Sequence, residues 1–428
     1  DYRRIREPLL DTLLSPFPPV QPAARLLARL GPRGAARFLR MALLSPRRLG
    51  EEEFAGLAGP VLLAGNALHT DLGPDSAGGA IYGWLLAMLG QDVGFPVPVG
   101  GAGALTAALV RRLRGRGGRL VCGMRVTRVL IHDGTAVGVT AADGTAVTAR
   151  RAVLADVDAP QLFAELVGLD RLPPSVAEDL RRFQWDTATF KVNWALSGPI
   201  PWTAEEARRA GTVHVTGWMD GLTRYAAQLA MSRLPAEPML VLGQTTTADP
   251  SRSPAGTESA WAYTHVPIRI VGDERADRGA ADVPLTGCWD RAESERFADR
   301  IQARIERFAP GFTSLIRARH IQSPLDLQAG DRNLRGGAIG AGTAALHQQL
   351  VFRPLASTSV RSALSAGIRT PVRRLFLASA SAHPGGGVHG ACGASAAHAA
   401  LASARLSRVR PAAARAAARV ARRGPRDG

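Results

Sequence analysis

A glycine-rich segment near the C-terminus has the residue types and spacing that best fit ligand chemistry. It begins at His383 and reads His-Pro-Gly-Gly-Gly-Val-His-Gly-Ala-Cys-Gly up to Gly393. Glycines lack the Cβ atoms that would hold a large flat or anionic ligand away from the backbone. A tight turn without a ligand is the alternative. The three consecutive glycines, the preceding proline and the two later glycines favour a ligand.

The residues on either side of this segment predict the elements that would position it. Residues 374–379 form a short apolar run, which predicts a strand, and the Ala-rich pattern of residues 394–406 predicts a helix. The first turn of a helix has unpaired N–H groups and the positive end of the helix dipole. A strand, a glycine loop and a helix start therefore predict a site for a flat or anionic ligand.

The composition is that of a globular protein with an unusual set of basic residues. The chain has 428 residues, of which 46% are hydrophobic, and a mean hydropathy of -0.01. The net charge is +17, but Lys191 is the single lysine among 53 basic residues. This indicates a general bias toward arginine, so we expect no nucleic-acid partner. Residues 408–428 predict a basic, disordered tail, with contact to an anionic membrane surface left open.

The cysteines and the apolar runs indicate the kind of cellular compartment in which we expect the chain. The chain has three cysteines, Cys122, Cys288 and Cys392, and no two of them form a C-x-x-C pair. An odd number without such a pair makes a disulfide framework or a zinc site unfavoured and favours a reducing, cytoplasmic compartment. Residues 80–89 form the best apolar run, which at about ten residues is too short to span a membrane and predicts a buried helix. The chain starts at Asp1 within an amphipathic pattern, and we expect that upstream residues are missing.

A second glycine-rich segment, residues 95–105, contains a Gly-x-Gly that could be mistaken for a dinucleotide-binding turn. Two prolines interrupt the preceding run, and no acidic residue follows about 20 positions later, so we reject that interpretation. The segment leads into a helix over residues 105–116. A regular β pattern follows, with Asp-Gly turns and strands predicted at 119–121, 126–132, 136–140 and 145–149 and a buried strand at 152–155.

The middle of the chain predicts a mixed α+β domain. Residues 160–184 have a helical pattern. Strands are then predicted at 187–196, 212–215, 239–246 and 260–266, followed by a helix at 293–308 and a strand that ends at 321.

The order of these pieces resembles the phytoene-desaturase-related FAD oxidoreductases, which are relatives of the amine oxidases. The resemblance covers about residues 60–405. It is carried by Pro98, Gly100, Gly101 and Leu105, by Gly117, Gly118 and Val126, by Asp143 and Gly144, and by the segment His383 to Gly393.

The resemblance implies an α/β fold: an FAD/NAD(P)-binding Rossmann-like fold, incomplete at the N-terminus, with an interleaved α+β substrate domain. The expected parts are a helical part of the substrate domain at 1–91, part of the FAD-binding domain at 92–165, the α+β substrate domain at 166–364, the C-terminal part of the FAD-binding domain at 365–407, and the tail at 408–428.

The resemblance also implies FAD as the cofactor and gives positions to it. Val126 would lie beside the adenine through its backbone, and Ala155 and Asp156 would flank the adenosine half. The isoalloxazine ring would meet the loop formed by His383, Pro384, Gly385, Gly386, Gly387 and Val388. A reduced flavin carries negative charge, which a helix start stabilises.

One part of the family pattern is not found in residues 1–60. The family opens with a strand and a Gly-x-Gly-x-x-Gly turn for the FAD pyrophosphate, followed by an acidic residue for the ribose. We expect that either upstream residues or another chain supplies this turn.

Other residues could do chemistry, and each has a structural alternative. His383 could assist proton transfer or simply pack. Asp156 and Asp158 fit ribose contact or loop capping better than acid–base work, and Arg353 could meet an anion or form an ion pair. The spacing of the nine histidines does not favour a metal site. Six tryptophans between 185 and 289 could line an apolar pocket, although ordinary core packing is favoured.

The sequence therefore predicts an FAD-dependent oxidoreductase of the dehydrogenase or desaturase type. Its substrate would be an apolar small molecule, isoprenoid or carotenoid-like. Because the cofactor carries hydride transfer, few catalytic side chains need be visible, and none is assigned. An amine-oxidase-like flavoenzyme and a non-catalytic remnant or binding subunit are the alternatives.

Overall fold

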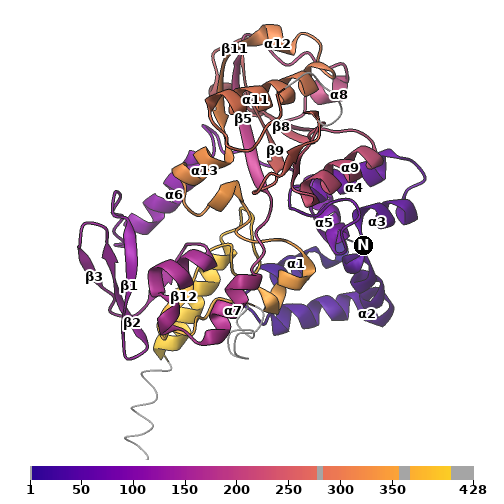
Figure 1. The fold of residues 1–428 in the computed structure, drawn as a ribbon. Coiled ribbons are helices and arrows are strands. Elements are labelled where there is room, and N and C mark those ends of the chain that lie inside the picture. The colour runs from indigo at the N-terminus through magenta and orange to yellow at the C-terminus, as the bar shows by residue number, and fades with distance from the viewer. Residues whose placement is uncertain (1, 277–282, 356–366, 406–428) are drawn as a thin grey trace, which may run out of the picture.

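The first ninety residues form a layer of helices. The computed structural model describes residues 2–276, 283–355 and 367–405 (Figure 1). Helix α2 bends at Gly31, whose φ is 67°, just before Pro32, which has no N–H for the helix ladder. The rings of Tyr2 and Phe38 pack edge-on against Trp84 and join α1 and α2 to α5. The helices are α1 (Tyr2–Leu14), α2 (Val20–Leu43), α3 (Pro46–Glu53), α4 (Ala58–Ala67) and α5 (Gly79–Asp92).

A five-stranded antiparallel sheet with the order β11-β5-β9-β8-β6 forms the second part. Helix α11 (Arg291–Glu306) packs on one face, while α4 and α9 (Met219–Ala230) lie against the other (Figure 1). Trp194, Trp202 and Trp289 are buried in the core on the α11 side, which confirms core packing for these three. The strands are β5 (Ala188–Leu196), β6 (Thr212–Val215), β8 (Leu240–Gln244), β9 (Glu258–Val266) and β11 (Ile316–Gln322).

A third part contains a β-meander and a short parallel strand pair. The hairpin between the first two meander strands turns at Asp133 and Gly134, whose φ values of 47° and 66° fit the predicted Asp-Gly turn. A helix over residues 391–405 and helix α6 (Gly103–Arg114) lie in the same lobe (Figure 1). The strands are β1 (Val126–His132), β2 (Thr135–Ala141), β3 (Ala146–Thr148), β4 (Val153–Ala155) and β12 (Leu375–Leu377).

Short elements connect these parts. They are a π-helix at Gln161–Val167, α7 (Pro174–Arg182), α8 (Glu205–Arg208), β7 (Arg233–Leu234), α10 (Thr245–Ala248), β10 (Gly272–Asp273), α12 (Phe312–Leu315), α13 (Pro324–Gly330), and short 3₁₀ turns.

Two strand predictions in this lobe are wrong in detail. Residues 119–121 form no strand, and Leu120 and Val121 are exposed. Strand β4 forms as predicted but is not buried, since Leu154 at its centre is 43% exposed. The reason is that β4 pairs with β12 alone among the strands that the structure describes, whereas a parallel sheet is normally covered on both faces.

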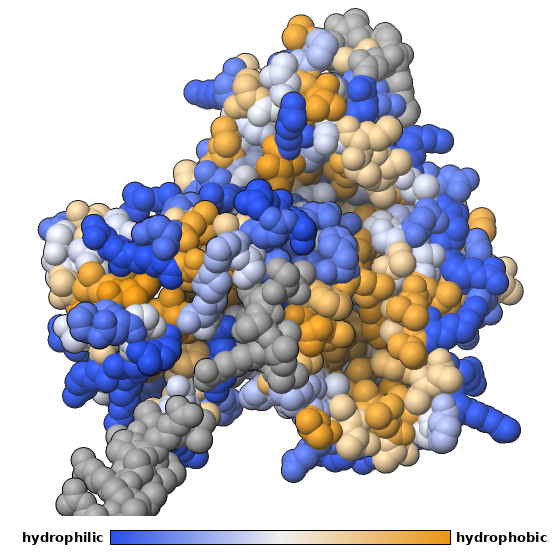
Figure 2. All heavy atoms as spheres, turned by 60° about the horizontal axis from the view of Figure 1, so that its bottom comes forward, coloured by the Kyte–Doolittle hydropathy of each residue, from blue (hydrophilic) through white to orange (hydrophobic). Residues whose placement is uncertain are grey.

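Apolar side chains reach the surface in the same lobe. Helix α6 has no buried residue, and Leu105, Leu109 and Leu113, spaced four apart along one side, are all exposed. Figure 2 shows apolar residues gathered in several exposed patches on one face of the molecule. Patches of this kind mark surfaces that fit a partner or another segment.

Helix α5 is only partly buried, in contrast to the fully buried helix predicted for residues 80–89. Its small residues Gly79, Ala80 and Gly83 are buried, and Leu85 and Leu86 are half-buried. Across the described ranges, no helix has the length and apolarity needed to cross a membrane. The predicted tail at 408–428 lies outside the described residues.

Candidate functional site

The predicted strand, glycine loop and helix are present in this order. Strand β12 pairs in parallel with β4, and the N–H of Ala378 donates to the carbonyl of Ala155 across the ends of the pair at 2.8 Å. The chain then forms the loop 378–390 and enters a helix at residue 391, three positions before the predicted start. The loop therefore leaves the carboxyl end of a parallel strand, the edge at which open α/β sheets bind ligands.

Backbone conformation in this loop requires glycine. Gly385 and Gly387 have φ values of 102° and 144°, which other residues rarely adopt. The N–H groups of Gly386, Gly387 and Val388 have no hydrogen-bond partner among the described residues. Successive free N–H groups just before a helix form a concave site for negative charge.

A second glycine-rich loop, residues 336–344, lies against the first and is held by two carboxylates. Asp186 accepts hydrogen bonds from the N–H groups of Gly340 at 2.7 Å and Gly342 at 3.1 Å. Asp71 accepts from the Ala344 N–H at 2.8 Å and from the Thr343 hydroxyl. Burial raises the pKa of Asp186, although the donors from the loop oppose this. Neither carboxylate was predicted, because no local motif marks them.

Arg353 connects the two loops. Its guanidinium donates to the carbonyls of Ala380 at 2.8 Å, Gly340 at 2.9 Å and Thr343 at 2.9 Å, and the residue is only 2% exposed. An added Cβ at Gly385 would lie 3.4 Å from the guanidinium carbon. Burial lowers the pKa of Arg353. Among the described residues Arg353 forms no ion pair, and its hydrogen-bond partners are backbone carbonyls. Contact with an anion, the other predicted role, stays a prediction.

The two loops and two helices enclose a cavity of about 360 Å³. The wall from α5 is mainly apolar and consists of Tyr82, Leu85, Leu86 and Leu89. The wall from α4 and the turn after it is polar, with Asn66, His69 and Asp71. Pro384, Gly385, Gly386 and Gly387 form part of the remaining wall. The arrangement can hold a flat ring against the glycines and an apolar molecule against α5.

Comparisons with known proteins find relatives that are named as oxidoreductases or desaturases. The chain is 30% identical over 311 residues to a mouse protein named pyridine nucleotide-disulfide oxidoreductase domain-containing protein 2, covering 70% of this chain and 50% of that protein. It is 26% identical over 296 residues to a lycopene-forming phytoene desaturase of a Paracoccus species, and the match covers 69% of this chain and 52% of that protein. The chain is related to the phytoene desaturases and these oxidoreductase domain proteins. It spans about half the length of the curated relatives it matches.

A solved structure supports the fold of this chain. An oxidoreductase from Methanosarcina mazei superposes with a TM-score of 0.53 at 13% sequence identity, over 86% of this chain and 70% of that one. The predicted α/β, Rossmann-like fold is thereby confirmed at the level of fold. No protein-family profile matches the chain.

The structure brings the predicted cofactor residues only partly together. Val388 is 93% exposed and lies outside the cavity. His383 is buried behind the loop, edge-on to the ring of Phe17, and burial and the Arg353 guanidinium lower the pKa of His383 to about 4.

The residues that were predicted to lie near the adenosine half of FAD belong to the third part of the fold, which contains the β-meander and the β4–β12 pair. Val126 begins β1 and is exposed, while Ala155 ends β4. Asp156 follows at the surface. Partial desolvation of its carboxyl, together with the nearby Asp331, raises the pKa of Asp156. Asp158 accepts from the Gln161 N–H at 2.7 Å and so caps the following helix.

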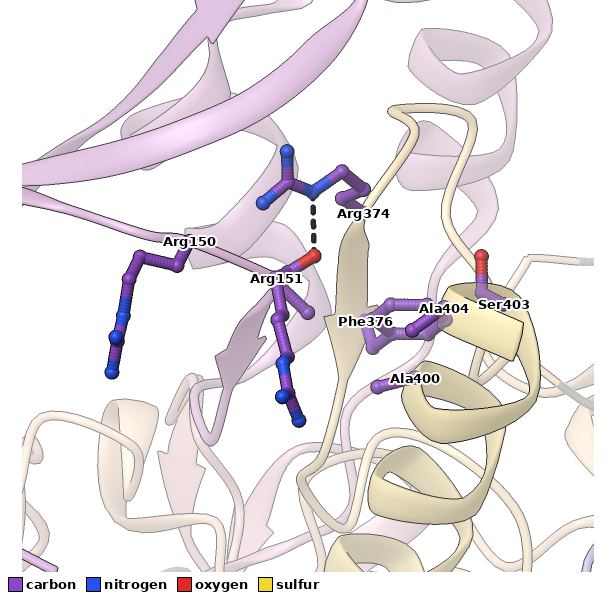
Figure 3. Close-up of a pocket in the computed structure, with 8 residues that line it drawn as sticks. Arg150, Arg151, Arg374, Phe376, Ala400, Ser403 and Ala404 are labelled. Carbon is purple, nitrogen blue, oxygen red and sulfur yellow. Dashed lines mark hydrogen bonds between the residues drawn. The ribbon is translucent and has the colours of Figure 1, made fainter. Parts of the chain in front are cut away.

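A larger hollow of about 820 Å³ lies elsewhere in the chain (Figure 3). Arg151, Arg374 and Phe376 line it together with the last turns of helix 391–405, and Arg374 donates to the carbonyl of Arg151. This hollow is at the amino ends of β4 and β12, away from the glycine loop. Because ligands of open α/β sheets bind at the carboxyl ends, the smaller cavity is the better candidate.

Proposed function

We propose that the chain forms the substrate site and one cofactor wall of an FAD-dependent oxidoreductase that oxidises an apolar, isoprenoid-like small molecule. The observation that carries the proposal is the set of free N–H groups at Gly386, Gly387 and Val388, directly before a helix. Such donors stabilise negative charge that develops on a flavin as it is reduced. Bound FAD would supply the hydride acceptor.

The chain's own residues would position the reactants. Gly385 to Gly387 would let the flavin ring approach the backbone, since no Cβ stands between them. Leu85, Leu86 and Leu89 of α5 would pack against the substrate and exclude water. Asp186 and Arg353 would keep both loops in place, because each makes several hydrogen bonds to loop backbone.

The phosphate half of FAD would need further support. Among the described strands β4 pairs with β12 alone, so its second edge is unpaired next to Ala155 and Asp156, and Leu154 on it is exposed. We propose that a segment that pairs with this edge holds the phosphates, with Asp156 on the adenosine side. The length of the relatives, about twice the matched part, supports this proposal.

The substrate class can be tested by flavin reduction without oxygen. Tyr82 is the one aromatic side chain, besides histidines, on the described cavity wall, so an aromatic pair that would favour an amine substrate is not seen among these residues. FAD-loaded protein mixed with phytoene in liposomes should lose its oxidised flavin absorbance, and an aliphatic diamine should leave it unchanged. Reduction by the diamine alone would overturn the apolar substrate class, and reduction by neither would favour a non-catalytic role.

A further inference from the structure

A hydrogen-bonded chain of three side chains borders the polar wall of the cavity. His69 follows α4 and lines the cavity, His214 is on β6, and Tyr263 is on β9. The Nε2 atoms of His69 and His214 are 2.8 Å apart, and the Tyr263 hydroxyl is 3.2 Å from Nδ1 of His69. Both nitrogens of His69 are therefore engaged, one on each side of its ring.

Burial keeps all three groups neutral near pH 7. Burial, with His214 and His265 nearby, lowers the pKa of His69 to about 4. Burial also lowers the pKa of His214 and raises the pKa of Tyr263 to about 12. The carboxylates on the same cavity, Asp71 and Asp186, are occupied by N–H and hydroxyl donors of the 336–344 loop. The three groups are thus linked by hydrogen bonds between neutral side chains and not by ion pairs.

The chain can be satisfied in two ways that differ only in proton positions. In one, the Tyr263 hydroxyl donates to Nδ1 of His69, and Nε2–H of His69 donates to His214. In the other, Nε2–H of His214 donates to His69, and Nδ1–H of His69 donates to the Tyr263 oxygen. Passing from the first state to the second takes up one proton at the Tyr263 oxygen and releases one from Nδ1 of His214, and no heavy atom has to move.

The two ends of the chain differ in their surroundings. His69 borders the cavity, whereas His214 is half-buried on β6, the edge strand of the sheet. Helix α4 has Gly65 where this strand approaches: an added Cβ there would be 2.8 Å from Nδ1 of His214. Glycine at this position therefore allows the close contact that brings the two imidazoles together.

We propose that His69, His214 and Tyr263 form a proton relay that serves the cavity, an inference that rests on the proposed oxidoreductase function. When a C–C single bond becomes a double bond, one carbon loses hydride to oxidised flavin and its neighbour loses a proton. That proton is taken up by the Tyr263 oxygen as its own hydroxyl proton passes to Nδ1 of His69, or it is taken up by Nδ1 of His69 directly. The Nε2 proton of His69 moves to His214, and His214 then releases a proton to solvent.

Histidine NMR of the full chain tests the relay without the cofactor. With ¹⁵N-labelled histidine, His69 and His214 should both be neutral at pH 7.5 and adopt the linked tautomers described above. Tyr263→Phe removes the donor to Nδ1 and should change the tautomers of both histidines, while His132→Gln, an exposed control, should change neither. A change confined to His69, or no change at all, would overturn the relay, provided that circular dichroism shows the variant to be folded.

A kinetic experiment distinguishes failure of the relay from failure of the proposed oxidoreductase function. In FAD-loaded protein mixed with phytoene liposomes, His214→Gln should slow flavin reduction on the order of 100-fold and alter its solvent deuterium isotope effect. A wild-type rate and isotope effect in His214→Gln would overturn the relay while the oxidoreductase function stood. Coupled tautomers in a protein that no substrate reduces would instead contradict the proposed function.

Discussion

The buried guanidinium of Arg353 donates to the carbonyls of Gly340 and Ala380, so one side chain fixes two glycine-rich loops that are distant in sequence. In the 336–344 loop the N–H of Gly340 also donates a hydrogen bond to the carboxylate of Asp186. The walls of the cavity thus depend on two charged side chains that form hydrogen bonds with the loop backbone.

Replacement of Arg353 should therefore destabilise the protein. Arg353→Met leaves buried carbonyls without donors, each of which costs about 1–3 kcal/mol. We expect the free energy of unfolding in urea to fall by at least about 3 kcal/mol. Arg353→Lys keeps the charge but not the planar set of donors, so its loss should be smaller. A loss below about 1 kcal/mol in Arg353→Met would contradict this role.

Removal of the Asp186 carboxylate should loosen the second loop. Asp186→Ala leaves the N–H groups of Ile339, Gly340 and Gly342 without their acceptor. Hydrogen exchange of these amides should become faster, and stability should fall by about 2–3 kcal/mol. Glu53→Ala, at an exposed position, serves as the control. Unchanged exchange at residues 339–342 would show that Asp186 does not hold the loop.

Stability should fall as the pH is lowered from about 6.5 to about 4. The pKa values of His69 and His383 are lowered to about 4 by burial, so the unfolded chain takes up protons in this window that the folded chain does not. The stabilising contribution is fully present above the unfolded value of about 6.5 and is lost toward pH 4. Around His383 the charged or titratable neighbours are Arg353 and His389, and around His69 the titratable neighbours are His214 and His265.

The double variant His69→Gln/His383→Gln isolates this effect from that of the carboxylates. Its urea midpoint should decrease less between pH 7 and pH 4.5 than that of the unsubstituted chain. An equal decrease in both proteins would mean that these histidines are protonated as readily in the folded state as in the unfolded state.

The exposed leucines of α6 should promote association. Leu109 and Leu113 lie on one side of a helix with no buried residue. Leu109→Lys/Leu113→Lys should change the unfolding free energy by about 0.5 kcal/mol or less, as is usual for surface positions. The variant should remain monomeric at protein concentrations at which the unsubstituted chain associates in light scattering. A large loss of stability would instead show that these leucines are packed.

Local sequence patterns predicted most elements of the fold. The strands at Ala188–Leu196, Thr212–Val215 and Glu258–Val266 lie within two residues of prediction, because strand preference and alternation are local properties. The glycine segment at 383–393 was also identifiable, since positive φ requires glycine wherever it occurs.

Long-range contacts were not predictable from the sequence. Asp186 binds Gly340 across 154 positions, and no pattern near either residue indicates it. The His69–His214 pair is separated by 145 positions. The exposure of Leu154 was missed for a related reason: an apolar run predicts a strand, but burial depends on whether a neighbour covers it.

Binding of FAD to the full chain tests the central claim most directly. Addition of FAD should perturb the flavin absorbance spectrum, and Gly387→Ala should weaken binding at least about tenfold, because φ is 144° there and a Cβ would be 3.0 Å from the His389 ring. Gly393→Ala, with open space around its Cβ and a position in helix 391–405, should bind FAD as the unsubstituted chain does. An unperturbed flavin spectrum, or equal affinity in Gly387→Ala and Gly393→Ala, would contradict the assignment of this loop to the flavin.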